Sequence, residues 1–169
     1  RAASTPSPAS DAPLIDLTTD NDAAIQELET ETRPETVLQK LQHMTFTERI
    51  KAAMRGTREV RAILIRDSNK LIATSVLASP KVSEAEVEGF AKMATVSEDV
   101  LRTISMNRGW MKNYGVVLAL TKNSKTPLAV SLTLLNRLIE RDVTSVANDR
   151  NVPDPLRIAA RRKIANSRT

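Results

Sequence analysis

The sequence predicts an all-α protein, arranged as an irregular helical-repeat superhelix (α-solenoid-like) of about nine or ten short helices. Two observations favour helices. Hydrophobic residues make up 41% of the 169 residues but only four are aromatic, so Leu, Ile, Val, Ala and Met must supply the core. The apolar residues also recur in segments of roughly 8–15 residues, each opened by a capping residue or proline. An all-β domain is therefore not expected.

The predicted helices begin at residue 34. Ser83 and Ser97 are residue types that cap a helix start, and Gly56 indicates a helix stop. The expected segments are 34–44, 45–56, 57–66, 67–80, 83–93, 97–104, 107–123, 126–139, a shorter piece around 143–146, and 152–164. These pieces are too many and too short for a four-helix bundle, which favours stacked units that bury one another's faces.

A similar short sequence motif, called the repeated word below, precedes several of these helices. It consists of a polar residue, then Val or Thr, then Ser or Pro, with an apolar residue three or four places on. Its Ser or Pro falls at Ser83, Ser97, Pro127 and Pro153, so the word repeats in form but not in period. A repeated helix start of this kind is typical of helical-repeat proteins.

Two stretches that contain these words resemble a known repeat family. Residues 118–127 (LALTKNSKTP) and 148–153 (NDRNVP) resemble leucine-rich variant repeats. Residues 44–164, with 65–71 (IRDSNKL) and 97–101 (SEDVL), resemble an uncharacterised group of bacterial helical-repeat proteins. The resemblance implies an α-helix alternating with a short tight helix in a right-handed superhelix, and a scaffold role without catalytic residues. The iron–sulfur-binding cysteines of some members are absent from this sequence.

Charge divides the chain into unlike parts. Residues 1–40 carry three basic and eight acidic residues, a net charge of −5, whereas residues 41–169 carry a net charge of +10. Residues 1–33 are also rich in Ala, Ser, Thr and Pro, a composition that buries too little apolar surface to offset the entropy of ordering. We expect a flexible acidic tail over 1–33, a helical-repeat domain over 34–166 and a short C-terminal end over 167–169.

One segment of the expected tail, residues 13–22 (PLIDLTTDND), alternates apolar residues and then turns acidic. It resembles a SUMO-interaction motif and is a candidate docking peptide that could add to a partner's sheet edge. The peptide would use Leu14, Ile15, Asp16 and Leu17. The alternatives are a simple spacer and a segment that folds back on the basic domain.

The composition argues against enzymatic chemistry. There is no cysteine, which excludes thiolate ligands and thiol nucleophiles, and the single histidine, His43, excludes a cluster of histidine ligands. Zinc, haem and Ser-His-Asp chemistry are therefore not expected. Neither a phosphate-binding glycine loop nor a calcium-binding loop is present. We therefore expect no catalytic residue, no cofactor and no metal site.

No apolar run approaches the length of a membrane span. The chain begins at Arg1 without a signal-peptide pattern, so it reads as a fragment or a processed chain, and we expect it in the cytoplasm.

The last predicted helix carries the densest group of cations: Arg157, Arg161, Arg162 and Lys163. Cations near a helix C-terminus complement the helix dipole without any ligand. The same group could instead receive the acidic tail or bind a polyanion such as nucleic acid.

A second candidate surface combines cations and aromatic rings: Arg108, Trp110, Lys112 and Tyr114. On one helix, Trp110 and Tyr114 would share a face, where two rings beside positive charge could receive an unpaired base or a partner's apolar side chain. The alternative is that both rings fill the core.

These features favour a non-enzymatic protein-interaction or scaffold module that binds a protein partner through its helical-repeat surface. The alternative is a nucleic-acid-binding module that uses the basic C-terminal half.

Overall fold

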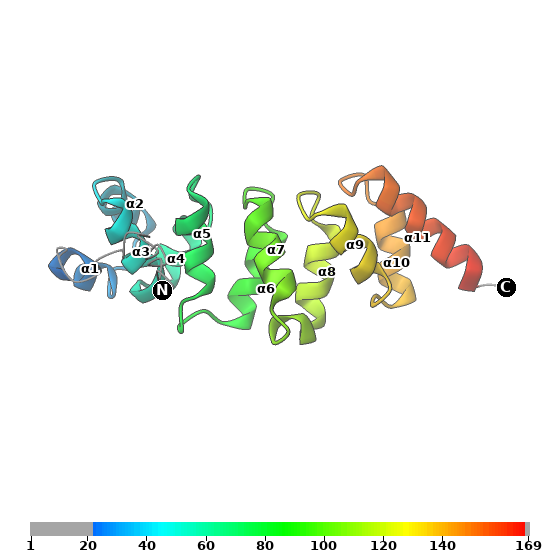
Figure 1. Cartoon of the computed structure of the whole chain (residues 1–169), viewed down its shortest axis with the longest axis horizontal. Helices are drawn as coiled ribbons and strands as arrows, with labels where there is room; N and C mark the ends of the chain where they lie inside the picture. The colour runs from blue at the N-terminus through cyan, green and yellow to red at the C-terminus, as the bar shows by residue number, and fades with distance from the viewer. Residues whose placement is uncertain (1–21, 168–169) are drawn as a thin grey trace, which may run out of the picture.

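The computed structural model describes residues 22–167. Within that range the chain forms eleven α-helices, one short 3-10 helix and no β-strand, which confirms the all-α fold class. Figure 1 shows that the helices follow one another along the longest axis of the molecule, from α1 and α2 at one end to α11 at the other. None of these helices is both long and apolar enough to cross a membrane.

The helix count agrees with the prediction, since ten α-helices lie between residue 34 and residue 167. The elements are α1 (Asp22–Leu28), α2 (Pro34–Gln42), α3 (Phe46–Arg55), α4 (Arg58–Leu64), α5 (Lys70–Leu77), α6 (Glu84–Lys92), α7 (Glu98–Met106), the 3-10 helix η1 (Trp110–Lys112), α8 (Tyr114–Lys122), α9 (Leu128–Leu135), α10 (Glu140–Asn148) and α11 (Asp154–Ser167).

Local capping fixes where several helices begin. Thr45 and Ser83 each form a capping box, in which the hydroxyl accepts a hydrogen bond from a backbone N–H three residues on and the glutamate there accepts one from the cap. The Ser97 hydroxyl caps α7 by accepting from the Val100 N–H. These three predicted helix starts are confirmed.

The repeated word also has a packing role. Its second residue is buried before α7, α9 and α11, where Val96, Thr126 and Val152 lie against the core, and Val82 is half-buried before α6. A residue that packs just before a helix fixes the angle at which the chain enters it. The word has no regular period because α8 and α10 begin without it, behind Asn113 and Ile139.

Most helices pack against a sequence neighbour or against the next helix but one. Helix α3 lies against α5, α5 against α7, α6 against α8, and α9 and α10 against α11. Branched aliphatic side chains fill these interfaces, and the largest fully buried ones include Ile25, Leu28, Leu64, Ile65, Leu101, Ile104, Leu120 and Leu156. A single hydrophobic core therefore follows the row of helices.

Helix C-termini are capped by side chains from further along the chain. The last carbonyl groups of a helix have no partner inside it. Ser79 Oγ donates to the Met54 carbonyl oxygen at 2.7 Å and Lys81 Nζ to that of Arg55 at 2.7 Å, so both satisfy the end of α3. Each bond joins residues 25 or 26 positions apart and ties one helical unit to the previous one.

The buried side chain of Asn123 caps the C-terminus of a helix in the same way. Its amide donates to the carbonyl oxygens of Ala91 at 2.8 Å and Met93 at 3.0 Å, at the end of α6. Its side-chain oxygen accepts from the Lys125 N–H at 3.0 Å. The sequence favours Asn123 as a local helix cap, and the structure adds this contact across 30 to 32 residues.

A buried ion pair joins α4 to α6. Arg61 Nε donates to Glu86 Oε1 at 2.9 Å and Arg61 Nη2 to Oε2 at 3.0 Å, while Nη1 donates to the Gly56 carbonyl oxygen at 2.9 Å. Both side chains are nearly inaccessible to solvent. Burial raises the pKa of Glu86, but hydrogen bonds from Arg61 and Ser83 outweigh it and hold the pKa below its usual range.

The predicted tail boundary at residue 33 is wrong for the residues that the structure describes. Residues 22–28 form α1, in which Ile25 and Leu28 are fully buried and pack towards α3. Composition misses this helix because only two apolar residues, spaced three apart, anchor it. The helical domain therefore includes residues 22–33.

One predicted helix is divided in the structure, and another is shorter than predicted. The segment 107–123 splits into η1 and α8 at Asn113, whose extended backbone and side-chain oxygen cap the start of α8. The segment 126–139 ends its helix at Leu135, and a turn over residues 136–139 leads into α10. Leu138 is buried in that turn, so its place in the apolar pattern reflects the core and not a longer helix.

Candidate functional site

Positive charge is concentrated in the second half of the described chain. Residues 22–100 contain eleven basic and thirteen acidic residues, a net charge of −2. Residues 101–167 contain twelve basic and four acidic residues, a net charge of +8. The acidic residues are too few to neutralise the cations there, so residues 101–167 carry the net positive charge of the described chain.

Two hydrogen bonds link the segments that carry parts of the two predicted cationic groups. Arg137 Nη2, in the turn after α9, donates to the Met111 carbonyl oxygen of η1 at 2.6 Å. Lys163 Nζ of α11 donates to Asn136 Oδ1 at 3.4 Å. These bonds connect the segment carrying two candidate cations to the last helix, and we call the set Arg108, Lys112, Arg137, Arg162 and Lys163 the basic edge.

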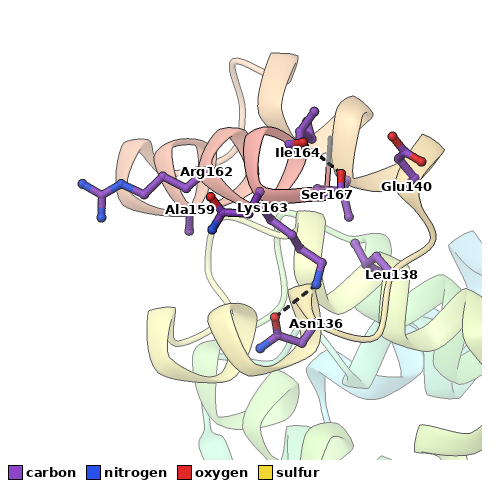
Figure 2. A pocket seen from close by; sticks show the side chains of 10 residues that line it. Asn136, Leu138, Glu140, Ala159, Arg162, Lys163, Ile164 and Ser167 are labelled. Carbon is purple, nitrogen blue, oxygen red and sulfur yellow. Dashed lines mark hydrogen bonds between the residues drawn. The ribbon is translucent and has the colours of Figure 1, made fainter. Parts of the chain in front are cut away.

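A groove of about 630 Å³ lies between α11 and the segment that joins α9 to α10. Figure 2 shows α11 on one side of this groove, with Asn136 and Leu138 on the other, and Lys163 extending between them. We call it the C-terminal groove; its lining residues are Asn136, Leu138, Glu140, Val143, Ala159, Arg162, Lys163, Ile164, Asn166 and Ser167.

The lining of the C-terminal groove combines apolar groups with two cations and one carboxylate, that of Glu140. Leu138, Val143, Ala159 and Ile164 contribute apolar surface. Lys163 places its ammonium across the groove, while Arg162 extends outwards from α11 at the rim. Such a combination suits a ligand that has both apolar side chains and negative charge.

The four predicted cations of α11 do not act as one patch. Arg162 and Lys163 line the C-terminal groove, whereas Arg157 and Arg161 do not. Arg157 forms an ion pair with Asp154 one turn earlier in the helix. Arg161 is exposed and forms no ion pair with any residue in the range 22–167. Adjacent positions point to different sides of a helix, which explains the division.

The expected pairing of Trp110 and Tyr114 on one helix face is wrong. Trp110 lies in η1 and packs, half-buried, against the core, whereas Tyr114 begins α8 on the other side of Asn113. The interruption at Asn113 removes the helical i, i+4 relationship on which the pairing depended. The two rings therefore do not form the stacking surface that the sequence predicts.

The Tyr114 hydroxyl has a structural role. It donates to Asp142 Oδ2 at 2.6 Å and accepts from the Ile139 N–H at 3.1 Å, which ties α8 to the start of α10. Burial and the hydrogen bond to Asp142 raise the pKa of Tyr114. The ring itself is 39% exposed, so only its polar end is fixed.

The candidate docking peptide, Leu14, Ile15, Asp16 and Leu17, lies outside the described residues. Sequence reasoning missed Asn136, Leu138, Val143 and Ala159 as lining residues. No local motif marks them, because the C-terminal groove forms only when three helices from residues 128–167 meet.

Among residues 22–167, no group of three or more His, Cys, Asp or Glu side chains is arranged to hold a metal ion. No family model matches this chain, and neither a curated protein nor a solved structure matches it.

Proposed function

We propose that this protein is a non-enzymatic interaction module, and that its C-terminal groove binds protein segments that combine apolar and acidic side chains. The observation that carries the proposal is the lining of that groove, where apolar residues of α10 and α11 stand beside Arg162 and Lys163. The excess of positive charge in residues 101–167 favours an acidic partner over a basic one.

Affinity and selectivity come from different parts of the groove. Apolar side chains of the partner contribute roughly 25 cal/mol for each Å² of surface removed from water. The two cations select carboxylates and accelerate association, an effect that salt screens. A peptide that has only apolar side chains, or only carboxylates, contacts only part of the groove lining and should bind more weakly.

A display selection with the full chain as bait tests this proposal. A random peptide library should yield sequences in which Leu, Ile or Val alternate with Asp or Glu. The double variant R162E/K163E should weaken the selected peptides by roughly tenfold or more, equivalent to the loss of ~1.4 kcal/mol. Binding is measured by fluorescence anisotropy of labelled peptides.

The matched control is R150E/K125E. It changes the net charge by the same amount, but Arg150 and Lys125 are exposed and lie in the loops before α11 and α9, outside the C-terminal groove. The control should leave peptide binding within about twofold of the wild type, since distant surface charges are screened. If the control weakens binding as much as R162E/K163E does, general electrostatic attraction replaces the groove as the explanation.

The basic edge supports a second candidate function, the binding of nucleic acid. Its cations come from residues 108–112, the turn after α9 and α11, which two hydrogen bonds link, and residues 101–167 have few acidic groups to oppose a phosphate backbone. A labelled oligothymidylate is the probe. Submicromolar binding at physiological salt, with a steep dependence on salt and a loss in R108E/K112E, would make this the better account.

A further inference from the structure

The chain itself contains a segment with the chemistry that the C-terminal groove favours. Residues 13–22 (PLIDLTTDND) carry three aliphatic side chains, Leu14, Ile15 and Leu17, together with three acidic ones, Asp16, Asp20 and Asp22, and no basic residue. Their charge is opposite to that of Arg162 and Lys163. Their aliphatic side chains match the apolar lining of the groove.

Covalent reach prevents this segment from filling the groove of its own chain. Asp22 begins α1, and Figure 1 places α1 and α11 at opposite ends of the longest axis. An extended chain from Asp22 back to Leu14 spans at most roughly 28 Å. Six successive helix-to-helix contacts, α1–α3–α5–α7–α8–α9–α11, separate α1 from α11, and at roughly 9 Å each they total roughly 54 Å.

We propose that residues 13–20 of one copy of this chain occupy the C-terminal groove of a second copy. This inference rests on the proposed function and names the partner of the same groove. In this arrangement the aliphatic side chains of Leu14, Ile15 and Leu17 lie against the apolar lining of the groove, and Asp16 and Asp20 face Arg162 and Lys163. Asp22 stays in α1, where it pairs with Lys51 and Arg55.

Such an interface is heterologous, because the segment and the groove are different surfaces of the chain. Each copy has one of each: the segment precedes α1 in the sequence and the groove is formed by α11, and Figure 1 places these two helices at opposite ends of the row. A contact of this kind joins copies head to tail, either into an open series or into a closed ring. Self-association should therefore depend on both surfaces and should weaken with salt, which screens the attraction between aspartates and cations.

Sedimentation of the full chain, measured over a range of protein concentrations, tests the proposal. The wild type should associate as concentration rises. The segment variant L14S/L17S and the groove variant R162E/K163E should each remain monomeric when alone. Circular dichroism should show the helical spectrum of the wild type in both variants, because the substituted groove residues lie on the solvent side of α11.

Mixing the two variants gives the sharpest result. The groove variant still carries an intact segment, and the segment variant still carries an intact groove, so one joint can form between them. The equimolar mixture should give a dimer and nothing larger. A second rescue combines D16K/D20K with R162E/K163E in one chain, which reverses both charges and should restore association.

The control R150E/K125E should associate like the wild type. The proposal is overturned if the wild type stays monomeric at all concentrations, if L14S/L17S still associates, or if the mixed variants remain monomeric. In any of those cases, library peptides that bind the wild type but not R162E/K163E would still support the proposed function. If R162E/K163E changes neither peptide binding nor association, both proposals fail.

Discussion

The guanidinium of Arg61 and the carboxylate of Glu86 form a two-pronged ion pair between α4 and α6, with Nε···Oε1 and Nη2···Oε2 distances of 2.9 and 3.0 Å. The Ser83 N–H and hydroxyl also donate to Glu86 Oε2, at 3.0 and 3.1 Å. The same carboxylate thus completes the capping box of α6 and neutralises a buried cation.

Replacing Glu86 by Ala should strongly destabilise the protein. The substitution leaves the Arg61 charge buried without a counter-charge, which costs about 3–5 kcal/mol of unfolding free energy. Thermal unfolding should shift downwards by roughly 10 °C for a domain of this size. Glu84→Ala is the control, because Glu84 is exposed on the same turn and should cost less than about 1 kcal/mol. Equal shifts for the two variants would contradict the assigned role of the pair.

The ion pair also predicts a pH dependence. The pKa of Glu86 is lowered in the folded protein from its ordinary value of 4.5, so its carboxylate favours folding. That contribution is complete above about pH 4.5 and is lost as the pH falls through the lowered folded-state pKa. The difference in thermal stability between the wild type and Glu86→Gln should therefore shrink as the pH drops below that value. A difference that stays constant down to strongly acidic pH would argue against it.

Thr126→Val should stabilise the protein. The Thr126 hydroxyl is buried without a hydrogen-bond partner among the described residues, and such a group costs about 1–3 kcal/mol. Valine has nearly the same shape and already occupies the equivalent position of the repeated word at Val96 and Val152. Chemical denaturation measures the gain. Thr121→Val is the control, since the buried Thr121 hydroxyl donates to the Val117 carbonyl oxygen at 2.8 Å and its removal should bring no gain.

Substitution by alanine should change the stability of the protein in opposite directions at two glycines. A Cβ on Gly56 would lie 2.6 Å from the Ala52 carbonyl oxygen and 2.6 Å from Val60 Cγ1, both in the packed interior. Gly56→Ala should therefore destabilise the protein. A Cβ on Gly89, within α6, meets nothing within 4 Å, so Gly89→Ala should stabilise the helix by about 0.5–1 kcal/mol. Denaturation midpoints that move in the same direction would contradict this contrast.

Sequence reasoning succeeds where the structure is determined locally. Ser83 and Ser97 begin helices because their hydroxyls satisfy backbone N–H groups three residues away. Gly56 ends α3 as predicted, although its φ of −64° is accessible to any residue. What requires glycine there is the close approach of Val60, which a local stop signal does not reveal.

The candidate site was predicted only in part, because it depends on contacts between distant residues. The cations of α11 are visible in the sequence, but a linear pattern does not separate Arg162 and Lys163, in the C-terminal groove, from Arg157 and Arg161 outside it. Asn136 joins the site only because the turn after α9 lies beside α11. Composition alone likewise places residues 22–28 in the tail, because the contacts that Ile25 and Leu28 make with α3 do not show in a composition.

The packing of each helix against near neighbours in the sequence has a kinetic consequence. Contacts between α3 and α5, or α6 and α8, close only short loops of chain, so little entropy is lost before native contacts form. Low contact order of this kind is associated with folding in roughly microseconds to milliseconds. Folding can also start at more than one place along the row and spread helix by helix, so the terminal helix α11 should open and close more often than the central ones.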